Sequence, residues 1–156
     1  EKIYDKVLDD KSLDKKLNLW REEGKSIVFS NGCFDILHRG HVEYLSKAAD
    51  LGEKLIIGLN TDASVKRLKG PSRPVNDEKS RAVILAALQF VDAVVFFEED
   101  TPYNLIKLVQ PDVLVKGNDY KVEDIVGYDV VTNKGGEVVT VELVEGFSTT
   151  NIISKL

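Results

Sequence analysis

Residues 26–41 read SIVFSNGCFDILHRGH, and this stretch decides how the rest of the chain is interpreted. Its first residues are mostly apolar and partly β-branched, and Gly32 follows them, which predicts a short buried strand over 26–30. Apolar side chains then recur at helical spacing over 42–49. A strand that passes through a loop into a helix is the repeating unit of a parallel α/β sheet.

The remainder of the chain repeats this alternation. Further apolar strands are predicted at 55–59, 93–97, 113–115 and 138–141, with helices between and after them at 61–68, 77–90, 101–109, 124–133 and 149–156. Strands that are apolar throughout indicate a parallel sheet covered by helices on both sides. We therefore predict one α/β domain over residues 1–156, with a parallel five-stranded sheet and helices on both faces. Residues 1–24 are expected to form a helical segment packed on this domain.

Local signals predict some helix ends and faces. Ser12 is the expected N-cap of the first helix, whose inner face would carry Leu13, Leu17 and Trp20. Thr101 is the expected N-cap of a later helix, with Pro102 at its first position. The inner face of helix 77–90 is expected to consist of Ile84, Ala87, Leu88 and Val91.

Composition argues against several classes of protein. A chain of 156 residues can bury a core without disulfides or structural metal. A net charge of −5 disfavours nucleic acid as a partner, and no apolar run is long enough to span a membrane. Cys33 is the single cysteine, which excludes an internal disulfide and favours a reducing compartment. We expect a cytoplasmic protein that binds neither nucleic acid nor membranes.

Both histidines of the chain, His38 and His41, lie on the loop after the first strand. If a helix begins near Gly40, its free N–H groups attract anions, and the imidazoles can donate to phosphate oxygens. Two other interpretations stay open. The histidines could be plain surface residues, or they could share a zinc ion with Cys33 or Asp35, since the chain has no further histidine. The strand–loop–helix context favours phosphate.

Hydroxyl residues near the end of the chain suit the same ligand. Ser148, Thr149 and Thr150 precede an apolar helical run. One of them could simply cap that helix, or all three could form a second anion cradle at its N-terminus. The pattern alone leaves both interpretations open.

Cationic residues give a similar choice. Lys66, Arg67, Lys69 and Arg73 gather in one segment, either as solvated surface or as an arm that contacts phosphate. Lys116 follows a predicted strand, where ligands of parallel sheets bind, and this position favours a functional role. Arg81 lies in a predicted helix and is equally compatible with an ion pair and with function.

The signatures of several common enzyme classes are absent. The sequence has no Gly-x-Ser-x-Gly elbow, no Walker motif and no Gly-x-Gly-x-x-Gly fingerprint. Its candidate residues are mostly cations and hydrogen-bond donors, which suits attack by a phosphate monoester on the α-phosphate of a nucleotide. Such a nucleophile is already ionised, so catalysis rests on alignment and on charge neutralisation. Magnesium bridging the nucleotide phosphates is the expected cofactor, with no separate metal site formed by the protein.

Two segments resemble the signatures of a known family. GCFDILHRGH at 32–41 and GFSTT at 146–150 are similar to those of the cytidylyltransferase-like nucleotidyltransferase superfamily. Further segments resemble its branch that makes ADP-heptose from ATP and D-glycero-β-D-manno-heptose 1-phosphate: NTDASVKRLKG at 60–70, SRPVN at 72–76, FEEDTP at 97–102, LVKGNDY at 114–120 and TTNII at 149–153. The similarity covers about residues 12–156. It implies a Rossmann-like fold, an adenylyltransferase with ATP and a sugar 1-phosphate as substrates, and a homodimer.

The resemblance also implies roles for individual residues. His38, His41 and Lys69 would be catalytic, the histidines by binding the nucleotide phosphates and stabilising the transition state. Lys66 would support Lys69 at the phosphates. The other implied nucleotide- or phosphate-binding residues are Gly32, Cys33, Phe34, Asp35, Gly40, Lys116, Ser148, Thr149 and Thr150.

One position departs from a related group. Glycerol-3-phosphate cytidylyltransferases carry an arginine five positions before the first hydroxyl of the second signature, where this chain has Leu143. This disfavours a cytidylyltransferase acting on glycerol 3-phosphate or another alcohol phosphate, which stays an alternative beside a non-catalytic nucleotide-binding module. Many heptose enzymes join this domain to a sugar kinase, so the kinase is expected either as a separate protein or as a further part of this one.

Overall fold

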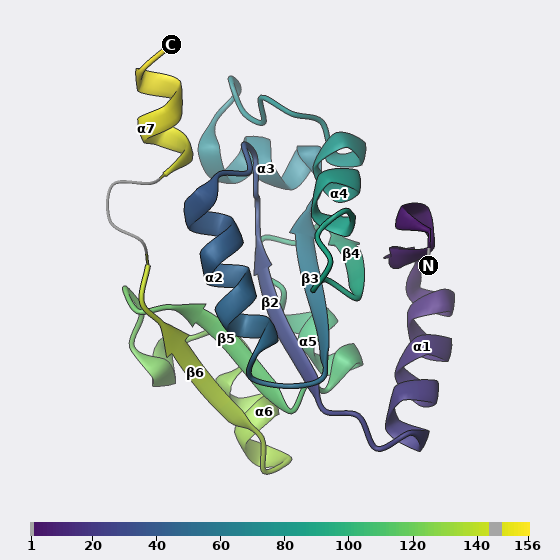
Figure 1. The fold of residues 1–156 in the computed structure, drawn as a ribbon. Helices are drawn as coiled ribbons and strands as arrows, with labels where there is room; N and C mark the ends of the chain where they lie inside the picture. The colour runs from purple at the N-terminus through teal and green to yellow at the C-terminus, as the bar shows by residue number, and fades with distance from the viewer. Residues whose placement is uncertain (1, 144–147) are drawn as a thin grey trace.

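Parallel strands form the centre of the structure, a computed structural model that describes residues 2–143 and 148–156 (Figure 1). The strands are β1 (Val7–Leu8), β2 (Ile27–Gly32), β3 (Lys54–Asn60), β4 (Ala93–Phe97), β5 (Val113–Gly117) and β6 (Glu137–Val141). They lie in the order β1-β4-β3-β2-β5-β6, and every neighbouring pair is parallel. The five predicted strands are present, and the sheet is parallel as predicted.

The prediction of only five strands was wrong. Strand β1 adds a sixth at the edge, where Val7 aligns with Val94 and Leu8 with Val95 of β4. Two residues carry no recognisable alternation of apolar and polar side chains. The strand exists because β4 offers it an unpaired edge, which the local sequence does not reveal.

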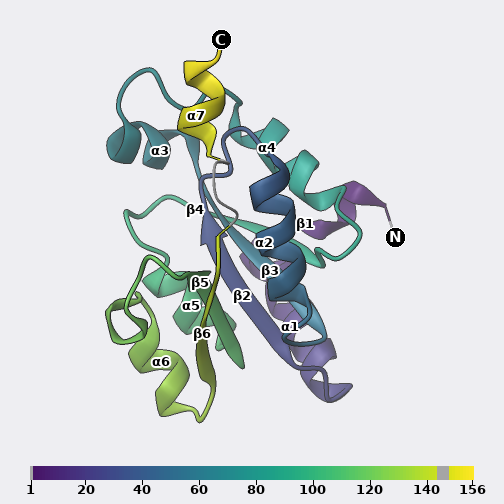
Figure 2. The ribbon, with the colours of Figure 1, turned by 60° about the vertical axis from the view of Figure 1, so that its left-hand side comes forward.

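Helices cover both faces of the sheet, as predicted (Figures 1 and 2). Helices α2 (Arg39–Ala49) and α4 (Glu78–Ala86) bury their apolar side chains in one of two core clusters. Helices α1 (Asp10–Glu22), α5 (Tyr103–Val109) and α6 (Tyr128–Asn133) contribute to the other. The remaining helices are η1 (Ile3–Lys6), α3 (Asp62–Lys69), η2 (Val122–Asp124) and α7 (Thr149–Ser154). Among the described residues, no helix is both long and apolar enough to cross a membrane.

The central strand shows why two layers of helices are needed. In β2, Ile27 and Phe29 belong to one core cluster and Val28 to the other, and all three are fully buried. Successive side chains of a strand point to opposite faces, so a strand that is apolar at every position needs cover on both. Helix α1 supplies part of that cover through Leu13, Leu17 and Trp20, which form its buried face as predicted.

Two predicted helix caps differ from the structure. The N-cap of α1 is Asp9, whose side chain accepts a hydrogen bond from the backbone N–H of Ser12. Ser12 bonds back to the N–H of Asp9, so it belongs to the capping box at the third helical position. At α5 the N-cap is Pro102 and no side chain caps the helix, which corrects the predicted role of Thr101.

The predicted inner face of α4 was partly wrong. Ile84 and Ala87 are exposed, whereas Leu88 packs against a core cluster and Val91 is fully buried, both beyond the end of the helix. The helix ends at Ala86, and its buried residues are Arg81, Ala82, Leu85 and Ala86, whereas Ile84 is 40% exposed. The pattern of apolar residues did not include Arg81 in the inner face, because arginine is usually exposed. Arg81 is buried here because its guanidinium has several hydrogen-bond partners.

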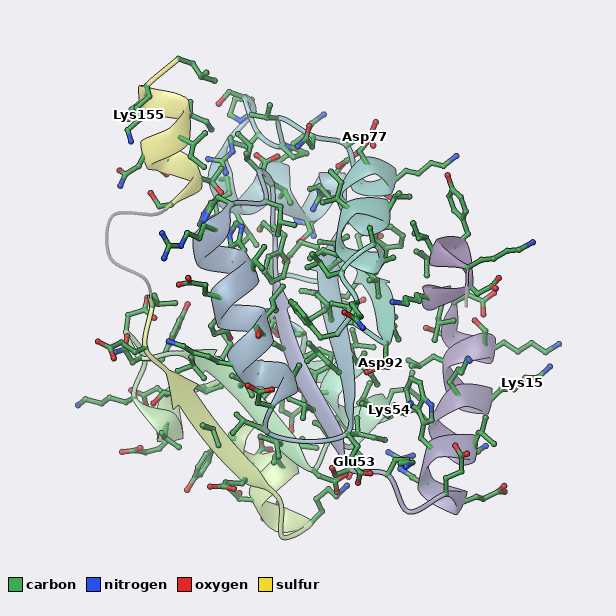
Figure 3. The ribbon with its side chains drawn as sticks, viewed as in Figure 1. Lys15, Glu53, Lys54, Asp77, Asp92 and Lys155 are labelled. Carbon is green, nitrogen blue, oxygen red and sulfur yellow. The ribbon has the colours of Figure 1, made fainter. Side chains whose placement is uncertain are left out.

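Aspartates close the amino ends of two central strands. Asp112 accepts a hydrogen bond from the first N–H of β2 at 2.8 Å, and Asp92 accepts one from Leu55 in β3 at 2.7 Å. Figure 3 shows Glu53, Lys54 and Asp92 together at this end, with Asp77 at the opposite end of the molecule. Part of the net negative charge is therefore placed away from the carboxyl ends of the strands.

Candidate active site

A cavity of ≈670 Å³ opens at the carboxyl ends of the strands. Strand β2 lies between β3 and β5 there, so the chain continues to one side of β2 first and to the other side later. Ligands of parallel sheets bind at this point of reversal, and the volume is within the ~300–1,000 Å³ typical of small-molecule sites. The loop after β2, the ends of β3, β4 and β5, the last turn of α3 and the start of α7 form its walls.

The structure brings nearly all of the predicted site residues together in this cavity. Those that line it are Gly32, Cys33, Phe34, Asp35, His38, Gly40, His41, Lys69, Lys116, Ser148, Thr149 and Thr150. Lys66 is an exposed residue of α3 and lies outside the described lining. Segments 32–41, 68–69, 116 and 148–150 therefore form one site although they are far apart in sequence. Residues 146 and 147 of the second signature lie outside the described residues.

His38 and His41 together cap helix α2. His38 is the N-cap, and its Nδ1 accepts a hydrogen bond from the N–H of Gly40 at 3.1 Å. His41 is the third residue of the helix, and its Nδ1 accepts from the N–H of His38 at 3.3 Å. The two rings stack with their centroids 3.8 Å apart. A neutral imidazole that accepts at Nδ1 carries its proton on Nε2, so each ring has its second nitrogen as a donor.

The electrostatic environment keeps both imidazoles neutral. Burial lowers the pKa of His38. Burial, and then the neighbouring His38, lower the pKa of His41 to about 4. At neutral pH the site therefore contains two uncharged Nε2–H donors beside the N-terminus of α2. A bound polyanion would raise both pKa values and strengthen these hydrogen bonds.

Phe34 shapes the turn between β2 and α2. Its φ of 44° lies in the left-handed region, which residues other than glycine rarely adopt. The ring packs edge-on against His41 with centroids 5.2 Å apart, and a Cβ on Gly32 would lie 2.9 Å from the same ring. Gly32 is therefore needed because the turn folds Phe34 back onto the strand end. Gly32 therefore acts on the site by allowing the position of the Phe34 ring.

Asp35 anchors the loop between α3 and α4. Its carboxylate is almost fully buried and accepts hydrogen bonds from the N–H groups of Val75 and Asn76 at 2.8 and 2.9 Å. The Arg73 guanidinium donates to it at 2.6 Å. Burial alone would raise the pKa of Asp35, but the N–H groups of Asn76 and Val75 and the Arg73 guanidinium outweigh it and lower that pKa. Asp35 thus positions Arg73 at the cavity, and its part in binding the nucleotide stays a prediction.

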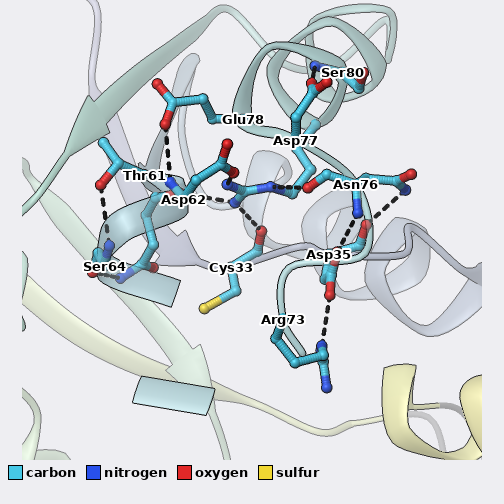
Figure 4. A network of polar contacts seen from close by, with 12 residues as sticks. Cys33, Asp35, Thr61, Asp62, Ser64, Arg73, Asn76, Asp77, Glu78 and Ser80 are labelled. Atoms are coloured by element: carbon cyan, nitrogen blue, oxygen red, sulfur yellow. Dashed lines mark hydrogen bonds and ion pairs between the residues drawn. The ribbon is translucent and has the colours of Figure 1, made fainter. Parts of the chain in front are cut away.

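Arg81 holds together the loops around the site. Its partners Cys33, Asp62 and Asn76 are labelled in the polar network of Figure 4. Its fully buried guanidinium donates to the backbone carbonyls of Cys33 and Asn60 at 2.8 Å each and to that of Asn76 at 3.0 Å. It also forms an ion pair with Asp62 at 2.8 Å. The sequence left Arg81 between an ion pair and a functional role. The structure gives it the ion pair and three loop contacts, and it lies outside the lining of the cavity.

Two lysines and a cluster of hydroxyls complete the lining. Lys69 is the last residue of α3, and Lys116 lies near the end of β5 with its Nζ 3.5 Å from the carbonyl of Asn31. Ser148 is the N-cap of α7 and accepts the N–H of Asn151 at 3.0 Å. The capping interpretation of the hydroxyl segment is confirmed for Ser148. Ser148, Thr149 and Thr150 also line the cavity, and the anion cradle stays a prediction.

Cys33 and Gly40 contribute mainly through the backbone. The carbonyl of Cys33 accepts from Arg81, and burial raises the pKa of its thiol. Gly40 is buried in the first turn of α2, where its N–H is used by His38. Within residues 2–143 and 148–156, the structure contains no group of three or more His, Cys, Asp or Glu side chains that could hold a metal ion.

Fold and site define a class of protein. The chain is a parallel α/β protein whose cavity at the point of strand reversal offers neutral histidine donors, lysines, an arginine and hydroxyls to an anionic ligand. A family model described as cytidylyltransferase-like matches residues 29–155, and the chain belongs to this family. The family predicted from the signatures is thereby confirmed.

Similar proteins agree with this membership. The bifunctional protein HldE of Nitrobacter hamburgensis is 57% identical over 143 residues, which cover 92% of this chain and 29% of that protein. The protein of the same name from Mesorhizobium japonicum is 57% identical over 152 residues, covering 97% and 31%. The chain thus spans less than a third of the length of these relatives.

Two solved structures are similar to this chain at lower sequence identity. A lipopolysaccharide core biosynthesis protein from Thermoplasma volcanium is 30% identical, with a TM-score of 0.63 over 78% of this chain and 98% of that one. The pantoate-beta-alanine ligase of Francisella tularensis is 14% identical, with a TM-score of 0.60 over 96% and 78%. The second likeness shows the fold alone.

Proposed function

We propose that the protein is an adenylyltransferase that transfers AMP from ATP to D-glycero-β-D-manno-heptose 1-phosphate and releases pyrophosphate. The observation that carries this proposal is the paired capping of α2. His38 and His41 each use Nδ1 for the helix, so each keeps an Nε2–H as a donor. Fixed donors of this kind, near lysines, are suited to negative charge that develops during phosphoryl transfer.

The proposed reaction needs one bond to form and one to break. A phosphate oxygen of the sugar 1-phosphate attacks the α-phosphorus of ATP, and the bridging oxygen to the β-phosphate leaves with pyrophosphate. The attacking oxygen is already ionised, so no residue has to remove a proton. His38 and His41 would stabilise the charge on the transferred phosphate, while Lys69 and the hydroxyls from Ser148 onward would hold the β- and γ-phosphates.

The choice of acceptor and base has separate support. The similar protein from Thermoplasma volcanium carries lipopolysaccharide core biosynthesis in its name, which favours a sugar phosphate as acceptor. Leu143 lines the cavity where glycerol-3-phosphate cytidylyltransferases have an arginine, and its apolar side chain offers no donor to a phosphate. Adenine as the base rests on the resemblance of the segments to the ADP-heptose branch.

Magnesium is proposed to enter with the triphosphate. This ion is usually held by substrate phosphates, water and one or two carboxylates, so it needs no dedicated protein cage. Asp100 and Asp119 line the cavity and are oxygen ligands of the right kind. When bound, magnesium would neutralise charge on the leaving pyrophosphate. We also propose action in the cytoplasm as a homodimer, and light scattering that gives the mass of a monomer would contradict the dimer.

The direct test is pyrophosphate release with magnesium, crossing ATP and CTP with heptose 1-phosphate and glycerol 3-phosphate. Turnover with ATP and heptose 1-phosphate alone is the expected result. Turnover with CTP and glycerol 3-phosphate would refute the substrates and keep the phosphate site. Binding of ATP without turnover of either acceptor would favour a non-catalytic nucleotide-binding module.

A further inference from the structure

A second, smaller cavity of ≈180 Å³ adjoins the main one. The two share Asn31, Asp100, Lys116 and Tyr120 in their linings, so they meet at a common wall. The smaller cavity is below the ~300 Å³ at which complete small-molecule sites begin. It can therefore hold one part of a ligand whose remainder lies in the main cavity. We call it the side cavity.

The side cavity differs from the main cavity in its chemistry. Buried Pro102 and Ile125 give it apolar surface, while Asp100, Thr101 and Asp124 supply oxygen atoms. None of the described residues that line the side cavity alone is a cation, whereas the main cavity adds Lys69 and Arg73, so the triphosphate is favoured in the main cavity. Carboxylates accept hydrogen bonds well from hydroxyls, and apolar surface packs against C–H groups. These properties suit the uncharged, polyhydroxylated body of a sugar.

Lys116 stands where the two cavities meet. Its Nζ lies 3.5 Å from the carbonyl of Asn31 and 5.4 Å from the centre of the Tyr120 ring. An ammonium group at this junction can bind a phosphate that belongs to a ligand in the side cavity. The same charge disfavours an acceptor with a cationic head group, although carboxylates and an aromatic ring would otherwise suit one.

From this arrangement we infer that the side cavity recognises the acceptor by its sugar hydroxyls, with Asp124 as a specificity-determining residue. Asp124 would accept hydrogen bonds from the sugar, and Lys116 would hold the sugar's phosphate toward the nucleotide. Asp124 comes from η2, outside every motif that identified the main site, and lines only the side cavity of the two. The inference rests on the proposed function for the identity of the sugar phosphate.

The test compares Asp124→Ala with Glu123→Ala. Glu123 is the neighbouring exposed carboxylate of η2 and lies outside the described linings of both cavities. In Asp124→Ala, the KM for heptose 1-phosphate should rise about 10- to 100-fold, the effect of one charged hydrogen-bond partner. The dissociation constant of a non-hydrolysable ATP analogue should stay unchanged. The preference for heptose 1-phosphate over glycerol 3-phosphate should fall by the same factor, while Glu123→Ala behaves as the unmodified protein.

Calorimetry of heptose 1-phosphate binding to the complex with the ATP analogue separates this inference from the proposed function. If the unmodified protein turns over heptose 1-phosphate and both variants have the same KM for it, sugar recognition by the side cavity is refuted and the proposed reaction stands. Binding that Asp124→Ala weakens, without turnover, would support the side cavity and refute the proposed reaction. No binding of the sugar phosphate would overturn both. Turnover of an amino-alcohol phosphate in place of the sugar would overturn the assignment of hydroxyl recognition.

Discussion

Each histidine of the pair serves the fold with one nitrogen and the site with the other. The Nδ1 atoms accept backbone N–H groups at the start of α2, which satisfies donors that a helix leaves free. This arrangement fixes the tautomer without a carboxylate behind the ring. It also makes the chemistry depend on protonation, since a proton on Nδ1 would remove the cap.

Stability should fall in acid because of His41. Its pKa is about 4 in the folded protein and near 6.5 when exposed, so the unfolded chain binds the proton more readily. The histidine's contribution is complete above pH 6.5 and is lost as the pH falls from 6.5 toward 4. Urea unfolding at pH 7.5, 6 and 5 measures this loss. His41→Gln, which has no titrating group, should show a shallower decline, and parallel declines would contradict the assignment.

Removing one donor should affect turnover far more than stability. We expect His38→Ala to lower kcat about 100- to 1,000-fold, as for the loss of one preorganised donor to a developing charge. The lost cap of α2 should cost about 1 kcal/mol of unfolding free energy. Lys47→Ala, at an exposed position of the same helix, is the matched control. A near-native kcat in His38→Ala would refute the proposed role.

The sequence identified the site well at this scale because its chemistry uses rare residues. Two histidines three positions apart, in a chain that has no others, are easily noticed in the sequence. Lysines are common and do not stand out, and only the resemblance gave Lys69 a catalytic role and Lys66 a supporting one. They lie on one short helix, and which of them faces the cavity depends on how α3 is rotated. The contacts of Arg81 were equally hidden, because its acceptors are carbonyls, which every residue has.

Helix α4 shows how one buried charge joins several elements. Arg81 contacts the loop after β2, the end of β3, the start of α3 and the loop before its own helix. Arg81→Ala should therefore destabilise the protein by about 3–5 kcal/mol, since it leaves three backbone carbonyls and Asp62 without this partner. Chemical denaturation measures the loss. Lys79→Ala, exposed on the same helix, should change stability by less than about 0.5 kcal/mol.

The elements themselves were more predictable than their ends. The five apolar strands of five to seven residues are visible in sequence because both faces of a parallel strand are buried. Helix caps are not visible in the sequence in this way. Several residues near Asp9 could accept the same N–H groups, and the backbone conformation decides which one does. The face of α4 failed for a different reason. An arginine whose guanidinium has four hydrogen-bond partners behaves as an inward residue, against its usual preference for the surface.

At the scale of the whole molecule, strand order creates the site. Helix–strand alternation predicted a parallel sheet with both faces covered, and the general rule for such sheets placed ligands at the carboxyl ends of the strands. Periodicity carries no information about which strands are neighbours. That β2 lies between β3 and β5, so that Lys69 and Lys116 reach one cavity from its two sides, is known only from the structure.

Ligand binding in this cavity, which several elements of the fold line, should stabilise the whole protein. ATP contacts segments from the loop after β2 to α7 in the proposed complex, and the unfolded chain offers no comparable site. At 100 times the dissociation constant, linkage gives about 2.7 kcal/mol, which raises the melting temperature of a chain of this size by about 5–10 °C. Thermal unfolding with ATP and magnesium measures the shift, and adenosine, which has no phosphates, should give much less. Lys69→Ala should require more ATP for the same shift than Lys66→Ala does, because Lys69 lines the cavity and Lys66 does not among the described residues. Equal shifts with ATP and adenosine would show that the phosphates are not bound by these donors.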